Sequence, residues 1–410
     1  MRTMCMSFAV LLVLPVSIDV SQALAARRPR AAVVSFEIPK DCPTGLPVLL
    51  HGQLVRGCLP STVVQVWNGD WGIGPILSQY DPQSGEVLCF LPVDRPELPG
   101  QTIWCCATAA CFNAAVTIEE TDAGFQFYDR GRPVMFYQKK PHSLDGGAHV
   151  SANYVHPLLG LDGETLTEDF PRDHRHHHGV FWAWHQIWVG QKRAGDAWAD
   201  KDFLPVVKKA EILEQGPLFA TLHVTVHWTS PLVADKQGRP IPIVQEETSI
   251  RLFRAVEDFQ YVDFAITLHA LLDDVRIGGA ENVKGYSGFT VRFRPPQGIA
   301  IVNDSGRLKQ DAVGAKGRYV DVSGLFAGGK AVSGAAILCH PSLPEFPPRW
   351  LLRHYGPQNV IYPGRYAVPL PKNQPLTLHQ RVLIHRGDAR QARVADHQGL
   401  YELSPAMPRP

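Results

Sequence analysis

The sequence predicts an all-β protein whose larger part is a large antiparallel β-sandwich. Apolar and polar residues alternate along 219–229, 259–269 and 376–385, the period of a half-buried strand. No segment carries an apolar stripe of helical period over three turns. The 35 glycines and 34 prolines are scattered along all 410 residues, which suits many strands joined by turns.

Residues 26–115 are predicted to form a small Cys-rich β-sandwich domain. Strand-like runs occur at 33–38, 63–67 and 86–91, and turn residues occupy 82–85 and 99–100. This segment holds six of the eight cysteines, and such clustering in one small region predicts disulfide bonds. The six are Cys42, Cys58, Cys89, Cys105, Cys106 and Cys111. The isolated Cys339 is expected to be a small buried apolar residue.

The larger domain is expected to span 116–405. It opens with strand-like runs at 116–120, 125–128 and 134–137, and a further alternating run covers 289–293. The polar faces of its long strands carry His223, His227, His269, His379 and His385. These histidines either line a concave binding face or lie on a solvated one, and the solvated face is the ordinary case for an antiparallel sheet.

Residues 1–25 are expected to be a signal peptide, which predicts a secreted or periplasmic protein. Arg2 precedes an apolar stretch at 9–20, and Ala23-Leu24-Ala25 is a small-x-small cleavage site. The stretch is short for a membrane anchor and contains Pro15 and Asp19. No later segment is predicted to span a bilayer.

The formal net charge is only +1, and like charges form no runs. Nucleic acids and anionic membranes require a basic surface, so neither is an expected partner. A small molecule remains the expected ligand, and the oligomeric state is left open.

The strongest functional signal is the run Asp173-His174-Arg175-His176-His177-His178-Gly179, which holds four of the seventeen histidines. In an extended chain, alternate members of this run would share a face. Three interpretations stay open. Two imidazoles could bind a divalent metal ion, the candidate cofactor, although no third ligand is evident. One or two imidazoles could act in acid–base catalysis, with Asp173 fixing a tautomer. The run could also be a polar loop, with Gly179 allowing a tight turn.

Candidate binding residues lie near this run and late in the chain. Trp182 and Trp184 follow the histidines, and indole faces can stack on a sugar or fill the core. A second group contains Trp350, Arg353 and Tyr355, a combination suited to gripping hydroxyls or carboxylates. Arg292, on the polar face of 289–293, completes the candidate binding residues. The catalytic candidates are Asp173, His174, His176, His177 and Glu246.

Glu246 is included because it precedes Glu247 at the head of a predicted strand. One of two adjacent carboxylates must face inward if the strand is half buried. Burial raises the basicity of a carboxylate, which suits a general base. A surface charge pair at a strand edge is the alternative.

Several motifs resemble those of the PmoA-like family, over roughly 116–388. The central motif comprises His156-Pro157-Leu158, Thr167-Glu168-Asp169-Phe170-Pro171 and Asp173-His174-x-His176-His177-x-Gly179-x-Phe181-x-Ala183. The second is Arg349-Trp350-x-x-Arg353-x-Tyr355-Gly356, and the third covers 317–324. After Gly356 the chain departs from the family pattern, because Pro357-Gln358-Asn359-Val360 replaces a stretch that leads to Asn-Pro.

The resemblance implies a galactose mutarotase-like supersandwich, in which histidines and a carboxylate act on a sugar ring. Carried over, His174, His176 and His177 would occupy the site, with Arg353 and Tyr355 on its rim. The sequence therefore predicts an exported carbohydrate-active protein, an epimerase, lyase or hydrolase. The alternatives are a non-catalytic carbohydrate-binding or cell-surface protein, and the metal-dependent oxygenase or hydrolase that the family label suggests.

Overall fold

The computed structural model describes residues 32–57, 59, 63–109, 112–144 and 146–408. The predicted signal peptide and two of the cysteines, Cys58 and Cys111, lie outside these residues. Within them the protein is almost entirely β-structure, and every strand pairing is antiparallel, as predicted. Among the described residues no helix has the length and hydrophobicity that crossing a bilayer requires.

The N-terminal domain is a closed six-stranded barrel with strand order β1-β2-β5-β4-β3-β6. The prediction of a sandwich is therefore wrong in architecture, although its three strand-like runs became β1, β3 and β5. The chain closes on itself because β6 pairs with both β1 and β3. The strands are β1 (Ala32–Glu37), β2 (Pro47–Arg56), β3 (Val63–Asn68), β4 (Ile73–Asp81), β5 (Glu86–Pro92) and β6 (Thr102–Ala109).

The predicted disulfides are absent from the described part of this domain, where Cys42, Cys89, Cys105 and Cys106 are free thiols. Adjacent residues on a strand point to opposite faces, so Cys105 and Cys106 face different ways. Cys89 and Cys105 lie in the barrel core as small apolar side chains. Burial raises the pKa of the Cys105 thiol to about 12. Cys339 is likewise free and completely buried, as expected.

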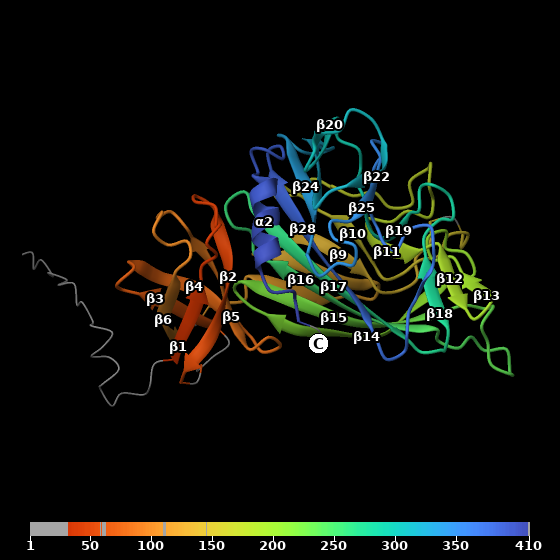
Figure 1. Cartoon of the computed structure of the whole chain (residues 1–410), viewed down its shortest axis with the longest axis horizontal. Helices are drawn as coiled ribbons and strands as arrows, with labels where there is room; N and C mark the ends of the chain where they lie inside the picture. Colours follow the sequence, from red (N-terminus) through yellow and green to blue (C-terminus); the bar gives the residue numbers. More distant parts are fainter. Residues whose placement is uncertain (1–31, 58, 60–62, 110–111, 145, 409–410) are drawn as a thin grey trace, which may run out of the picture.

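The larger domain is built on two nine-stranded sheets (Figure 1). The first, called here the site sheet, has the order β22-β25-β26-β19-β11-β10-β9-β8-β7. Its strands are β7 (Val116–Glu120), β8 (Gly124–Asp129), β9 (Arg132–Gln138), β10 (Tyr154–Leu158), β11 (Val180–Trp184), β19 (Ser287–Arg292), β22 (Ala312–Lys316), β25 (Arg349–Leu352) and β26 (Pro357–Ile361).

The second sheet, called here the back sheet, has the order β14-β15-β16-β17-β28-β24-β23-β20-β21. The three long alternating segments of the sequence form its β15, β17 and β28. Its strands are β14 (Leu204–Gln215), β15 (Phe219–Thr229), β16 (Val244–Phe253), β17 (Phe259–Ala270), β20 (Gln297–Asn303), β21 (Gly306–Arg307), β23 (Tyr319–Leu325), β24 (Ser333–Cys339) and β28 (Leu376–Arg386).

A four-stranded sheet of order β13-β12-β18-β27 completes the domain. It comprises β12 (Gln186–Val189), β13 (Lys192–Gly195), β18 (Val275–Gly278) and β27 (Val368–Pro369). The helix α2 (Val394–Leu403) follows the last long strand. This helix was not predicted, because ten residues make fewer than three turns and give a weak periodic signal.

The main core lies between the site sheet and the back sheet. Trp182 and Trp184 of β11 point into it, and Trp182 packs against Phe264 of the back sheet with ring centroids 6.1 Å apart. The alternate residues of β11, Phe181 and Ala183, face the other way and form a small cluster with Tyr154 and Trp198. The outer face of β11 is therefore apolar and covered by loops, and these loops contain the histidine run.

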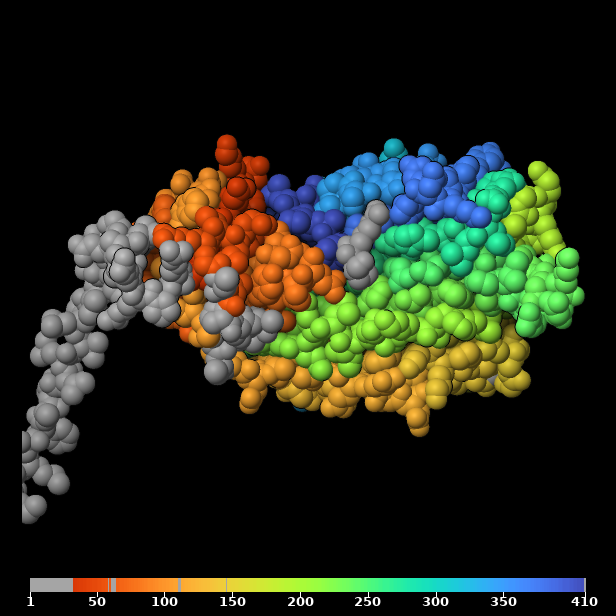
Figure 2. All heavy atoms as spheres, turned by 90° about the horizontal axis from the view of Figure 1, so that it is seen from below, coloured from red at the N-terminus to blue at the C-terminus, as the bar shows by residue number. Residues whose placement is uncertain are grey.

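A second core joins the barrel to one end of the larger domain (Figures 1 and 2). Phe90 of β5 lies 6.0 Å from the rings of Phe253, Phe259 and Tyr261 of the back sheet. Tyr401 of α2 belongs to the same cluster. The barrel is thus packed against the end of the sandwich next to α2.

Candidate functional site

The histidine run forms two successive turns at the start of β11. The backbone N–H of His174 donates to Pro171 and that of His177 donates to His174, over 3.2 and 2.9 Å. The expectation that alternate histidines of an extended segment share a face is therefore wrong. Gly179 ends the run where the backbone passes Val155 so closely that a Cβ would lie 2.2 Å from its carbonyl oxygen. Glycine is thus required at 179 by the close approach of Val155, and not by a left-handed turn, because its φ is not positive.

His174 is held by its carboxylate neighbour and by two aromatic rings. Its Nδ1 donates to Asp173 Oδ2 over 2.9 Å. Its ring is stacked on that of Tyr355 at 5.2 Å and on that of His177 at 4.7 Å, with interplanar angles of 11° and 14°. The His174 side chain remains 36% exposed. His174 is thus a fixed and partly exposed imidazole. It lies where the histidine run meets the distant segment that carries Tyr355.

Arg292, the last residue of β19, lies beneath this group. Its Nη2 donates to Asp173 Oδ1 over 2.9 Å and to Glu168 Oε2 over 3.2 Å. Its guanidinium carbon is 5.3 Å from the centroid of the Tyr355 ring. Partial burial alone would raise the pKa of Asp173, but the hydrogen bonds from His174 and Arg292 outweigh burial and lower it. Asp173 is therefore ionised at neutral pH.

Arg353 flanks the same group from the turn that follows β25. Its Nη1 lies 3.9 Å from Asp311 Oδ2. Burial raises the pKa of Tyr355, whereas the positive charges of Arg353 and Arg292 oppose the shift. The structure thus brings together the predicted residues Asp173, His174, His177, Arg292, Arg353 and Tyr355. We call these six the histidine site.

His176 and His177 are neutral members of the run. Burial lowers the pKa of His176 to about 4, although the nearby Asp200 opposes the shift. Burial, with help from His176 and Arg292, lowers the pKa of His177 well below its usual value. The His177 ring also meets Trp198 edge-on at 5.7 Å. Both imidazoles are therefore neutral at neutral pH and resist protonation.

His178 was not among the predicted site residues, yet it has the strongest charge contacts in the run. Its Nδ1 donates to Asp169 Oδ1 over 2.8 Å, and its Nε2 lies 3.5 Å from Asp200 Oδ2. Burial alone would lower the pKa of His178, but the two carboxylates outweigh burial and raise it to about 9. Asp169 belongs to the motif Thr167–Pro171 and could be recognised from the sequence. Asp200 could not, because its loop has no recognisable pattern.

Glu246 lies apart from the histidine site. It is 1% exposed on β16, and its Oε1 accepts hydrogen bonds from Asn153, Trp182 and Thr248, while its Oε2 accepts one from Trp228. Burial raises the pKa of Glu246, and these hydrogen bonds oppose the shift. The carboxylate therefore ties β10, β11 and β15 together through the core.

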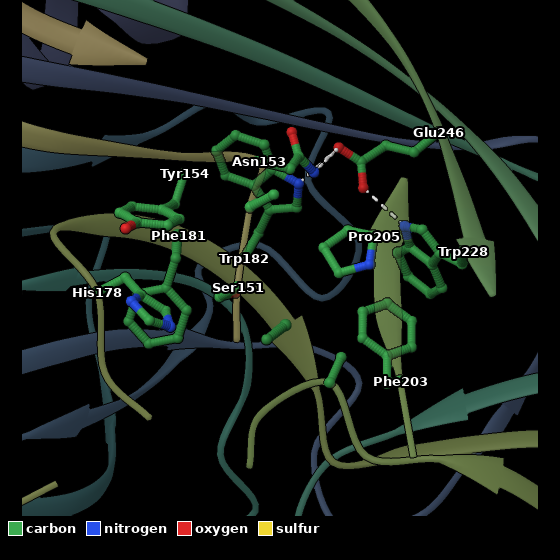
Figure 3. Close-up of a pocket in the computed structure, with 13 residues that line it drawn as sticks. Ser151, Asn153, Tyr154, His178, Phe181, Trp182, Phe203, Pro205, Trp228 and Glu246 are labelled. Atoms are coloured by element: carbon green, nitrogen blue, oxygen red, sulfur yellow. Dashed lines mark hydrogen bonds between the residues drawn. The ribbon is translucent and has the colours of Figure 1, made fainter. Parts of the chain in front are cut away.

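Glu246 and His178 line the same small cavity, on opposite sides of it (Figure 3). Its volume is about 30 Å³, room for roughly one water molecule. Ligand pockets generally measure several hundred cubic ångströms, on the order of 300 or more. The predicted role of Glu246 as a base that touches substrate is therefore corrected to a role in the core.

The three tryptophans proposed to bind substrate are buried. Trp184 and Trp350 are completely enclosed and donate to the carbonyl oxygens of Tyr362 and Gly317. Trp182 is buried with its indole N–H on Glu246. Their assignment as substrate-binding residues is therefore wrong, because each inward position of β11 and β25 faces the core rather than the surface.

A wider hollow of about 300 Å³ lies on the other side of Trp198, lined by His185, Arg193, Gly195, Asp196, Lys201, Asp202 and Leu232. His185 lies between two carboxylates, with Nδ1 2.7 Å from Asp196 and Nε2 3.0 Å from Glu281. Trp198 and Tyr286, with ring centroids 4.7 Å apart, separate it from the histidine site.

The residues that the structure describes contain no group of three or more His, Cys, Asp or Glu side chains arranged to hold a metal ion. The histidine run as described therefore offers no set of ligands for the divalent cation considered from the sequence. Both ring nitrogens of His178 face carboxylates, Nδ1 at 2.8 Å from Asp169 and Nε2 at 3.5 Å from Asp200.

A family model described as "Family of unknown function (DUF6807)" matches residues 125–398, more than half of the chain. The chain belongs to this family. The DUF6807 region begins in β8 and ends in α2, so it contains the whole histidine site and leaves out the barrel. The resemblance to the PmoA-like family stays a prediction. No curated protein sequence matches the chain.

Two solved structures from Enterococcus faecalis are similar to this chain. One is a protein in glycosyl hydrolase family 38, with 11% identity and a TM-score of 0.43 over 92% of this chain and 47% of that one. The other is an alpha-mannosidase from strain V583, with 10% identity and a TM-score of 0.44 over 91% of this chain and 45% of that one. This chain spans about half the length of each.

Proposed function

We propose that this protein binds a carbohydrate or sugar derivative at the histidine site and acts on it by acid–base chemistry. The observation that carries the proposal is the Asp173–His174 pair: the carboxylate holds Nδ1, while the ring, stacked on Tyr355, stays partly exposed. A carboxylate on Nδ1 fixes the tautomer and leaves Nε2 to exchange a proton with a ligand.

Binding is supported by the side chains around His174. Tyr355 is 37% exposed, and its ring and that of His174 offer apolar faces with polar edges. Arg353 and Arg292 lie beside these rings and can donate hydrogen bonds to hydroxyl or carboxylate oxygens. Aromatic faces next to fixed polar donors are the combination that a sugar ring requires, because the ring has apolar C–H faces and a polar rim.

The proposed chemistry needs a group that can hold either protonation state. His174 keeps its Nδ1 proton on the ionised Asp173, so its Nε2 would accept a proton from the substrate, and the resulting imidazolium, stabilised by Asp173, would return that proton to a ring or leaving oxygen. His177, which burial keeps neutral, would contribute its stacked ring and a hydrogen bond rather than accept a proton. Such an arrangement serves an epimerase, a lyase or a hydrolase alike. Export, which this proposal includes, stays a prediction from residues 1–25.

The experiment screens a panel of neutral and acidic mono- and disaccharides. Thermal shift measures binding, and proton NMR measures conversion. The unmodified protein is compared with Asp173→Asn and His174→Gln. The matched control is His227→Gln, a half-buried histidine on β15 of the back sheet. We expect at least one sugar to raise the melting temperature, and its conversion to fall by 10²-fold or more, on the order expected for a general acid–base group, in both site variants.

Two results would contradict the proposal. If no sugar of the panel raises the melting temperature, the carbohydrate ligand is wrong. If a sugar binds but is neither converted by the unmodified protein nor bound more weakly by His174→Gln, the acid–base role is wrong, and the protein is a binding protein whose site lies elsewhere.

A further inference from the structure

Arg292 has unused hydrogen-bonding capacity in a place that water does not reach. Its side chain is 3% exposed. Asp173 and Glu168 both accept from the same nitrogen, Nη2, whereas Nε and Nη1 are buried without a hydrogen-bond partner. Nearly all buried polar groups in folded proteins are paired, because a buried donor without a partner destabilises the folded state. The two free donors therefore require an explanation.

His177 adds a third unpaired polar atom, next to the guanidinium. Its side chain is buried, and its Nδ1 has no hydrogen-bond partner. The charge of Arg292 is one of the causes that lower the pKa of His177, which places the two groups near each other. Because His177 is neutral, this nitrogen can donate to or accept from a ligand without adding charge.

Tyr355 covers Arg292, and His174 lies between Tyr355 and His177. The Tyr355 ring lies over the guanidinium of Arg292 and stacks on His174, which stacks in turn on His177. The next residue, Gly356, has a φ of 136°, and a Cβ there would lie 2.9 Å from Arg292 Nε. The turn is therefore fitted closely around the arginine. A rotation of the partly exposed Tyr355 ring would expose the arginine to a ligand.

We propose that the ligand of the histidine site carries a carboxylate group that binds Arg292 beneath Tyr355, so that the site prefers an acidic sugar such as a uronic acid. This inference rests on the proposed function. A guanidinium binds a carboxylate through charge-assisted hydrogen bonds, and such a group would accept from the free Nη1, whereas Nε points to the other side of the planar guanidinium, against Gly356. Arg353, beside Tyr355, is a second arginine near the ligand, and its Nη1 lies 3.9 Å from Asp311 Oδ2.

The local charge favours a carboxylate over a phosphate. Asp173 and Glu168 lie against Nη2 of Arg292, and Asp311 lies 3.9 Å from Nη1 of Arg353, so the positive charges of both arginines are already offset. A group of charge −1 adds less repulsion from these two carboxylates than a phosphate of charge near −2. Asp173 and Glu168 both lie on Nη2, so a ligand on the free Nη1 avoids the nitrogen that they share.

The test measures binding by calorimetry with matched pairs of sugars: galacturonate against galactose and glucuronate against glucose. The variants are Arg353→Gln and Arg292→Lys, which keeps the charge that Asp173 and Glu168 need. The control is Arg349→Gln, an exposed arginine on β25. We expect one acid to bind at least tenfold more tightly than its neutral partner, and both site variants, but not the control, to reduce this ratio severalfold.

The failures are distinguishable. If neutral and acidic partners bind equally and both lose affinity in His174→Gln, the preference for a carboxylate is overturned and the proposed function stands. If the acid is preferred but Arg353→Gln and a folded Arg292→Lys keep the full ratio, the assignment to Arg292 is overturned. If no sugar binds, the proposed function fails and this inference fails with it.

Discussion

Tyr154 is stacked on His178, with ring centroids 4.5 Å apart and an interplanar angle of 27°. The Tyr154 hydroxyl donates to Asp169 Oδ2 over 3.0 Å, and Asp169 Oδ1 accepts from His178. A buried cationic imidazole is thus fixed between β10, the loop before β11 and the loop that carries Asp200. This arrangement anchors the run that presents His174 and His177.

The first prediction concerns pH and stability. The pKa of His178, about 9 in the folded protein, exceeds the usual value of about 6.5 in an unfolded chain. The protonated His178 therefore adds on the order of 3 kcal/mol to the free energy of unfolding. This stabilisation is fully present below about pH 6.5 and is lost as the pH rises through 9. Urea unfolding at pH 6, 7.5 and 9 should show this decline in the free energy of unfolding. Asp169→Asn should flatten it, and an unchanged slope in this variant would contradict the assignment.

The second prediction concerns Glu246. Replacing it with alanine leaves the indole N–H groups of Trp182 and Trp228 and the amide of Asn153 buried without an acceptor. We expect Glu246→Ala to lower the free energy of unfolding by about 3–5 kcal/mol and Glu246→Gln, which keeps an acceptor oxygen, by less. Denaturant titration measures both. Full stability together with lost sugar conversion in Glu246→Gln would restore Glu246 as a catalytic candidate.

The third prediction separates core rings from site rings. Trp184→Ala should cost about 3–5 kcal/mol of stability, because it opens a cavity between the two sheets. Tyr355→Ala should cost less, since the ring is partly exposed, but should weaken ligand binding at least tenfold. Thermal unfolding and calorimetry on the same samples give both quantities. A Tyr355→Ala protein that binds sugar normally would remove this ring from the site.

The fourth prediction concerns the cysteines. Cys42, Cys89 and Cys105 are buried free thiols, so alkylation of the native protein without reductant should leave them unmodified. After unfolding, again without reductant, all three should react, as peptide mass spectrometry can show. If they react only after reduction, they are disulfide-bonded, and the sequence-based expectation was right.

Much of the fold followed from period-2 alternation. The segments 219–229, 259–269 and 376–385 became β15, β17 and β28, because one face of each packs into the core between the sheets. The closure of the barrel did not follow, since it depends on β6 reaching both β1 and β3, and no local pattern records such pairing. The cysteine cluster misled because spacing alone does not distinguish bonded thiols from apolar core residues.

The candidate site could be predicted in part. The density of histidines and the arginine–tyrosine motif located Asp173, His174, Arg353 and Tyr355, which do meet. Trp184 and Trp350 looked equally suitable for binding a ligand. They lie in the core instead, because the neighbouring sheet decides which face of a strand is buried. Asp200 could not be predicted, because its loop contacts His178 only through the tertiary fold.

The most direct test of the histidine site is histidine side-chain NMR during titration with a sugar that binds. We expect the ring resonances of His174 and His177 to shift on binding, whereas that of His227 on the back sheet should not. Shifts at His185, in the hollow beyond Trp198, with unchanged His174 and His177, would place the ligand elsewhere and contradict the assignment of the histidine site.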